Sequence, residues 1–117
     1  MKNVPLTFPI RGWDGNPIAV DGKPLTVREL CLQYVGTFES ENGKDCIIAR
    51  KIGQRIYDCT EDMIALEDAE FNILERSMQK PRHIAIVMGH LLEIMDDVKN
   101  GKTSNENAAK GSKETLQ

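Results

Sequence analysis

The chain has 117 residues, of which 40% are hydrophobic and 28% are charged, and its formal net charge is −3. A chain of this length has too little apolar side-chain area for two cores, so we expect one globular domain over residues 1–100. No segment approaches the roughly 18 consecutive apolar residues that predict a membrane span, and the small negative charge disfavours a protein whose main ligand is nucleic acid. We expect a cytoplasmic protein.

A β-hairpin is predicted over residues 4–21. Apolar side chains alternate with threonine and proline in its first half, the Asp14-Gly15 dipeptide is typical of a tight turn, and residues 17–20 form a short return strand. An isolated hairpin is marginally stable, so its apolar side should lie on helices. The alternating apolar residues are Leu6, Phe8 and Ile10.

The single tryptophan, Trp13, lies next to the predicted turn. It either packs against the helices or forms an exposed contact. Because a large aromatic side chain supplies much buried area, we expect it to pack.

Four helices are predicted from apolar residues that recur every three or four positions. A capping box of Thr26 and Glu29 precedes the first helix, Asp45 is the expected N-cap of the second, and Pro81 separates the third from the fourth. Between the second and third helices, residues 63–66 are apolar and extended or turn-like. The four helices span residues 27–38, 45–59, 67–79 and 82–99.

The fourth predicted helix is the most apolar, and its hydrophobic residues cover more than half of its circumference. This pattern predicts either a central position in the fold or a face covered by another chain. Gly89 lies four residues after Ala85, and an interior glycine costs about 1 kcal/mol relative to alanine. We therefore expect tight packing at Gly89.

The remaining 17 residues, 101–117, contain one large aliphatic side chain and no aromatic one. Such a segment cannot bury enough apolar area to offset the entropy of ordering, so we predict a disordered tail. Together, these patterns predict an α+β fold in which an N-terminal β-hairpin packs on a bundle of about four helices.

The three cysteines, Cys31, Cys46 and Cys59, are far apart and odd in number. A disulfide framework usually has an even number of closely spaced cysteines. We expect reduced, buried thiols that act as small hydrophobic side chains.

The sequence lacks the common catalytic motifs and phosphate-binding glycine loops, so we expect no enzyme, no catalytic residues and no cofactor. His83 and His90 could share one helical face, but no C-x-x-C or H-x-x-x-H pair accompanies them, and structural zinc needs about four ligands. We expect no metal and a hydrogen-bonded histidine at a helix edge. The carboxylates are expected to be helix N-terminal charges and a solvated rim. They are Glu61, Asp62, Glu67, Asp68, Glu70, Asp96 and Asp97.

A basic face on the second predicted helix indicates an alternative function, that of a small DNA-binding or regulatory protein. Its side chains could contact phosphates as a helix-turn-helix element does. Acidic residues in the preceding loop oppose this, so pairing with the acidic start of the third helix, or solvation, is favoured. The basic residues are Lys44, Arg50, Lys51 and Arg55.

Two segments carry a family resemblance. The first contains W-D-G-N-P-I and K-P-L-T-V-R-E-L within residues 13–30, and the second is I-A-L-E-D-A-E-F-N-I-L at residues 64–74. The layout resembles small proteins of tailed bacteriophages and prophages, most of unassigned function. These have an L-D-G-type hairpin, a helix after L-T and a helix after L-(D/E)-D-A-(D/E)-F. Trp13 stands where those proteins usually carry an aliphatic residue.

The resemblance covers residues 6 to 98 approximately and brings no active-site residues. It implies a phage-type accessory protein in the cytoplasm of a bacterial host, acting through protein contacts. We therefore expect a non-enzymatic protein that binds a phage or host protein, with self-association through the fourth helix as a further option. The candidate interface residues are Trp13, Ala85, Met88, Gly89 and Leu92.

Overall fold

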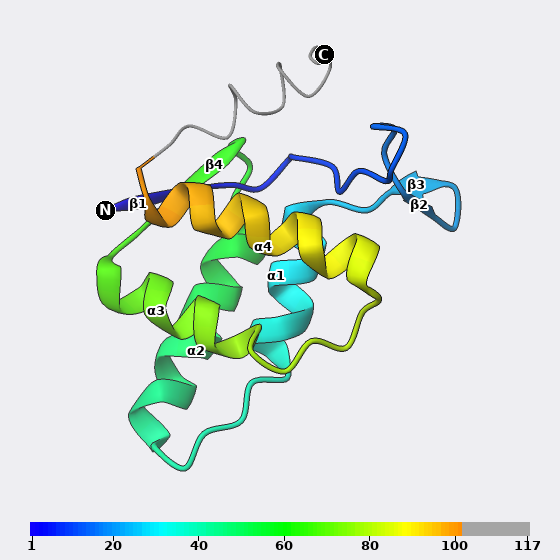
Figure 1. The fold of residues 1–117 in the computed structure, drawn as a ribbon. Helices are drawn as coiled ribbons and strands as arrows, with labels where there is room; N and C mark the ends of the chain where they lie inside the picture. Colours follow the sequence, from blue (N-terminus) through cyan, green and yellow to red (C-terminus); the bar gives the residue numbers. More distant parts are fainter. Residues whose placement is uncertain (102–117) are drawn as a thin grey trace.

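The computed structural model describes residues 1–101, which form four helices and two small antiparallel sheets (Figure 1). The predicted α+β class, with an N-terminal hairpin and four helices, is confirmed. The helices are α1 (Val27–Gly36), α2 (Gly43–Asp58), α3 (Asp68–Ser77) and α4 (Ala85–Lys99). The strands are β1 (Lys2–Pro5), β2 (Ala19–Val20), β3 (Lys23–Pro24) and β4 (Met63–Leu66). Beyond Gly101, the predicted disordered tail lies outside the described residues.

The N-terminal hairpin is shorter than the predicted span of residues 4–21 and lies later in the chain. It consists of β2 and β3, joined at Asp21 and Gly22, whose φ angles of 52° and 80° suit a two-residue hairpin turn. The preceding segment runs beside it: the Ile10 N–H donates to Leu25 O, and the Ile18 N–H donates to Ile10 O, both at 2.8 Å. Proline lacks an amide hydrogen, and the prolines of this segment interrupt the ladder that we had predicted over Leu6 to Ile10.

The first strand, β1, pairs with β4, and Val4 stands opposite Ile64. Residues 63–66 are therefore a strand, in agreement with the extended conformation expected there. β1 belongs to a separate sheet from the hairpin. No local sequence pattern predicts this pairing, because the β2–β3 hairpin and the whole of α1 and α2 lie between the two strands in the chain.

The helix boundaries follow the capping groups. Thr26 caps α1 by accepting a hydrogen bond from the Glu29 N–H. Asn42, and not the predicted Asp45, caps α2, since its side-chain oxygen accepts from the Lys44 N–H at 2.9 Å. α2 therefore begins two residues earlier than predicted. Glu67 and Glu70 form a reciprocal capping box at the start of α3.

The start of α4 comes three residues later than predicted. The Arg82 N–H donates to the Tyr34 hydroxyl oxygen at 2.9 Å, and the same hydroxyl lies 2.7 Å from Nδ1 of His83. These contacts hold the residues after Pro81 against α1, so they do not enter the helix. Ile84 becomes the N-cap of α4, without a side-chain capping hydrogen bond.

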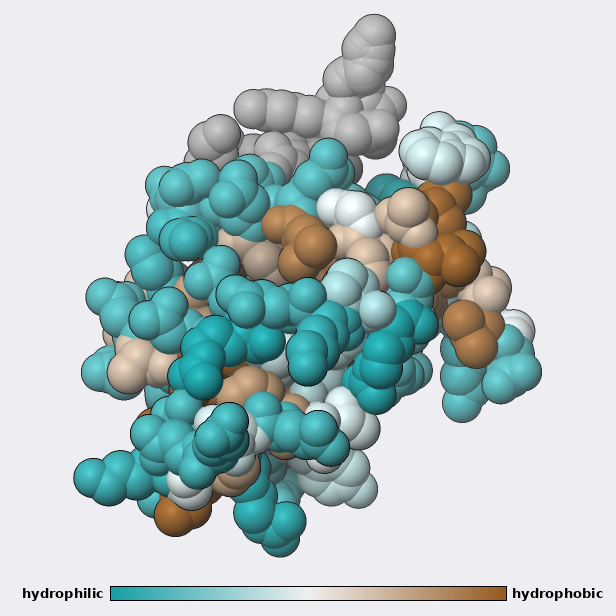
Figure 2. Space-filling model, turned by 60° about the horizontal axis from the view of Figure 1, so that its bottom comes forward, coloured by the Kyte–Doolittle hydropathy of each residue, from teal (hydrophilic) through white to brown (hydrophobic). Residues whose placement is uncertain are grey.

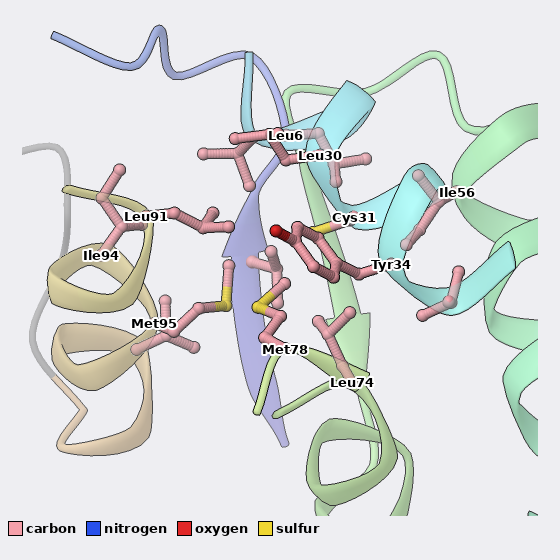
Figure 3. Packing of buried hydrophobic residues seen from close by; sticks show 14 of the residues in the cluster. Leu6, Leu30, Cys31, Tyr34, Ile56, Leu74, Met78, Leu91, Ile94 and Met95 are labelled. Carbon is pink, nitrogen blue, oxygen red and sulfur yellow. The ribbon is translucent and has the colours of Figure 1, made fainter. Parts of the chain in front are cut away.

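One hydrophobic core joins the β1–β4 sheet to all four helices, and α1 lies at its middle. In Figure 3, Cys31 and Tyr34 of α1 lie between the α4 side chains Leu91 and Met95 and the α2 side chain Ile56. α4 lies along one side of the molecule, against β1 (Figure 1). The predicted central position of α4 is wrong, because only one of its faces is buried. The buried α4 residues are Val87, Met88, Leu91, Ile94, Met95 and Val98.

The three cysteines are free, and they differ in exposure. Cys31 is buried, and this burial raises the pKa of its thiol to about 12. Cys59 is partly buried, whereas Cys46 is exposed, so the expectation of burial is wrong for Cys46. Of the helices in residues 1–101, none combines the length and the apolar character that a membrane crossing requires.

Candidate functional site

We call residues 9–25, which include a turn at residues 12–16 and the β2–β3 hairpin, the N-terminal ribbon. Trp13 lies in the turn at residues 12–16 and is 90% exposed. The backbone around it forms a closed turn, in which the Gly12 N–H donates to Asn16 O at 3.0 Å and Gly15 has a φ of 80°. Asp14 secures the turn by accepting hydrogen bonds from the main-chain and side-chain nitrogens of Asn16. The expectation that Trp13 packs on the helices is therefore wrong: its turn is ordered, yet its side chain points into solvent.

The base of this turn is fixed to α4. The Arg11 N–H donates to Nδ1 of His90 at 2.8 Å. A Cβ atom on Gly12 would lie 3.6 Å from Cδ1 of Ile86 and 3.8 Å from Cγ1 of Ile18, so the three residues are in close contact. These residues form the contact between the ribbon and α4. Trp13 lies outside this contact.

Large apolar side chains are exposed on the segments that meet at this junction. Trp13 is 90% exposed, Ile84 71% and Val20 51%, around the partly buried Ile18 and Ile86. Figure 2 shows hydrophobic side chains gathered at the right-hand edge, the end where Figure 1 places the β2–β3 ribbon and the start of α4. We call these five residues the ribbon-end surface.

A second exposed feature runs along α4. Ala85, Gly89, Leu92 and Asp96 are all exposed, and their spacing places them on one line of the helix. Leu92 is 42% exposed and borders a cavity of about 510 Å³ between α3 and α4. We call these four residues the α4 strip.

Gly89 has no packing partner in the part of the chain that the structure describes. A Cβ atom at this position would meet no other atom within 4 Å. The expectation of tight packing at Gly89 is therefore wrong for residues 1–101.

Met88, the remaining candidate interface residue, lies inside the core. It is 4% exposed, and its sulfur accepts a hydrogen bond from the Tyr34 hydroxyl at 3.1 Å. Met88 therefore belongs to neither surface.

The two histidines hold different segments in place. His83 lies before α4 and pairs with Tyr34, whereas His90 lies within α4 and accepts from Arg11. Burial lowers the pKa of His90 from its usual 6.5, with a counteracting effect from the Glu93 carboxylate and a further lowering by Arg11. Within residues 1–101, no three or more His, Cys, Asp and Glu side chains are grouped so that they could hold a metal ion.

Three of the four basic residues of α2 share one face, and the fourth lies on another. Arg55 forms an ion pair with Glu70 at 2.8 Å and donates to Ala65 O at 2.7 Å, so the expected pairing with the acidic start of the third helix is confirmed for Arg55. Lys44 and Lys51 are exposed and share the Arg55 face by helical spacing. Arg50 instead lines a groove between α1 and α2, of about 360 Å³.

A further basic cavity, of about 460 Å³, lies where α1 and α3 end. Its two arginines are engaged: Arg76 pairs with Asp45 at 2.8 Å, and Arg82 donates to Thr37 Oγ1 at 2.6 Å. These contacts hold the loops that follow α1 and α3 in place.

The predicted interface missed five members of the two surfaces, which are Ile18, Val20, Ile84, Ile86 and Asp96. Ile84 was counted among the apolar residues of the fourth helix, but as N-cap it directs its side chain outside the helical stripe. Val20 lies in a ribbon too short to bury it, and Asp96 was assigned to a solvated rim. No local signal marks the exposure of Ile84, because Pro81 restricts only Lys80 before it. The contacts of Arg82 and His83 with the Tyr34 hydroxyl decide where α4 begins.

Comparison with known proteins gives no match: no family model, no curated protein and no solved structure is significantly similar to this chain.

Proposed function

We propose that this is a non-enzymatic interaction protein that binds a partner protein through the ribbon-end surface. The observation that carries the proposal is the exposure of Trp13, at 90%, together with that of Ile84, at 71%, and Val20, at 51%. Clustered exposed apolar side chains mark interaction sites on soluble proteins, and tryptophan is enriched among residues that dominate binding energy.

The ribbon-end surface has a fixed support, which favours binding. The Arg11 main chain is tied to His90 at 2.8 Å, and the Arg11 guanidinium donates to Gly15 O at 2.7 Å. The turn that carries Trp13 is thus held from both sides. A partner would lose little conformational entropy by ordering this turn, and more of the contact energy would remain as affinity.

The phage resemblance suggests the setting of this interaction. The resembling segments include the ribbon, the start of α1, β4 and the first part of α3, so hairpin and helices follow in the order that the resemblance implies. We propose a phage-type accessory protein whose partner is a phage or host protein in the bacterial cytoplasm. The absence of common catalytic motifs from the sequence supports a binding role over an enzymatic one.

Nucleic-acid binding has less support. The charge of Arg55 is balanced by Glu70, and Arg50 faces a different groove from Lys44 and Lys51. A phosphate backbone would meet too few free cations on one face for strong binding.

A comparative capture experiment tests the proposal. The full chain, a Trp13→Ser variant and a Tyr57→Ser variant are immobilised, and host and phage-infected lysates are passed over each. Tyr57 is the matched control, because it is 67% exposed on α2. We expect a protein retained by the native chain and by Tyr57→Ser, and lost with Trp13→Ser. Equal capture by all three forms, or capture by none, would contradict the proposal.

A further inference from the structure

The α4 strip is complementary to itself. Gly89 offers a bare stretch of helix backbone with no atom within 4 Å of a Cβ position, and Leu92 projects a 42% exposed side chain from the next turn. The strip therefore has a depression at Gly89 and, next to it, an apolar projection formed by Leu92. A surface that pairs with a second copy of itself needs both features on the same chain.

We infer that the α4 strip binds the α4 strip of a second copy of this chain, with the two helices antiparallel. A two-fold axis between Gly89 and Leu92 places each Leu92 over Gly89 of the second copy. The same axis places Asp96 opposite Ala85 of the second copy. Parallel helices would instead set Leu92 against Leu92 and leave both glycines unfilled. The shape of the strip thus favours the antiparallel arrangement.

The charges along α4 favour the same arrangement. The first turn of α4 has no acidic residue and no side-chain cap, and Arg82 lies just before it. Acidic residues follow in its second half, at Glu93, Asp96 and Asp97. The basic residue of its last turn, Lys99, lies 3.8 Å from the Glu75 carboxylate of α3. This distribution is unfavourable for an isolated helix, because the helix dipole is positive at the N-terminus and negative at the C-terminus. In an antiparallel pair, the acidic half of each helix lies beside the positive end of the other.

The size of the strip sets the strength of the pairing. α4 has 15 residues, so a contact between two such helices extends over about 22 Å. A contact of this length buries less than the roughly 1,200 Å² of a stable standard interface. We therefore expect a reversible dimer with a dissociation constant in the micromolar range.

This inference rests on the proposed interaction role, and it names the partner of the second surface. Sedimentation equilibrium of the full chain across the micromolar range tests it with Gly89→Gln and Gly36→Gln. Both glycines are exposed on helices, and a Cβ atom at either meets nothing within 4 Å, so Gly36 is a matched control. We expect Gly89→Gln to raise the dissociation constant about tenfold or more and Gly36→Gln to leave it unchanged. Chemical unfolding of each variant shows whether the fold is retained.

A charge exchange tests the orientation and does not depend on Gly89. Asp96→Lys should weaken the dimer, because the lysine would lie at the positive end of the second helix. Adding Ala85→Asp should restore it, because the new aspartate faces the new lysine of the other copy. With parallel helices, like charges would face each other and no restoration would occur.

The outcomes separate this inference from the proposed function. A native chain that is monomeric throughout the micromolar range overturns the inference, while capture that depends on Trp13 would still support the proposed function. A dimer that is lost with Trp13→Ser but kept with Gly89→Gln also overturns it. A dimer that depends on Gly89 and is restored by the charge exchange supports it, even if Trp13 captures nothing.

Discussion

The main-chain N–H of Arg11 donates a hydrogen bond to Nδ1 of His90 at 2.8 Å, and this bond ties the N-terminal ribbon to α4. The bond requires an unprotonated Nδ1, because an imidazolium ion has no acceptor. The orientation of the ribbon-end surface is therefore coupled to the charge of one histidine.

We expect the free energy of unfolding to fall as the pH is lowered through 6.5, in part because of His90. The folded-state pKa of His90 lies below its usual 6.5, chiefly through burial, so the unfolded state binds the proton more readily. The stabilisation that depends on neutral His90 is fully present above pH 6.5, and it is lost as the pH falls through the lower folded-state pKa. Urea unfolding at a series of pH values measures it.

The control for this effect is His90→Asn, in which the amide oxygen can replace Nδ1 as the acceptor and does not titrate. The native chain should lose more stability than the variant between neutral and mildly acidic pH. Identical pH profiles for the two proteins would show that protonation of His90 does not influence stability.

Leu91 and Leu92 are adjacent but opposite in burial, at 0% and 42% exposed. We expect Leu91→Ala to lower the free energy of unfolding by about 2–5 kcal/mol, because it leaves a cavity in the core. We expect Leu92→Ala to lower it by at most about 1 kcal/mol, because solvent already reaches this side chain. Thermal or urea unfolding of both variants checks the orientation of α4, and similar losses would contradict it.

The pattern of helical spacing predicted which α4 residues are buried better than it predicted where α4 lies. Leu91 and Met95 follow the stripe, and both are buried. Ala85 and Gly89 were added to the apolar count, although small residues tolerate exposure at little cost. That addition made α4 look buried on all sides, and the prediction of a central helix followed from it.

The Arg55–Glu70 ion pair joins α2 to the start of α3 and can be tested separately from helix capping. Burial alone would raise the pKa of the Glu70 carboxyl, but hydrogen bonds from the Glu67 N–H and Arg55 outweigh this, so the pKa lies below 4.5. We expect Glu70→Gln to lower the free energy of unfolding by about 1 kcal/mol or less, since glutamine keeps the capping bond and loses the charge.

The loss caused by Glu70→Gln should depend on pH. The stabilisation by a carboxylate with a lowered pKa is present above 4.5 and disappears as the pH falls through its folded-state value. Glu75→Gln is the control, because the Glu75–Lys99 pair is longer, at 3.8 Å. A loss of equal size in both variants would contradict a specific role for Glu70.

The cysteines should react with thiol reagents at very different rates. Cys46 is exposed and should be modified quickly, whereas Cys31, buried and with a pKa raised to about 12, should react only after unfolding. Mass spectrometry of peptides after a short exposure counts the modified thiols. Modification of Cys31 as fast as that of Cys46 in the folded protein would refute the placement of α1 in the core.

The interface residues were only partly predictable from the sequence, for a physical reason. Met88 is buried and Leu92 is exposed, although the two residues are only about one helical turn apart on α4. A local sequence pattern cannot give the direction from which α1 packs against α4. Trp13 was expected to pack because of its size. The hydrogen bonds of Asp14 and Asn16 determine its turn instead, and they hold the tryptophan beyond the reach of α4.

Trp13 is the only tryptophan of the chain, so its fluorescence reports directly on the ribbon-end surface. The measurement is the emission of the native full chain alone and during titration with the protein that it captures. We expect emission typical of a solvated indole in the free chain, strong quenching by a soluble quencher, and a blue shift with loss of quenching as the partner binds. Emission that is already shielded in the free chain, or that stays unchanged when the partner binds, would contradict the assignment of Trp13 to an interaction surface.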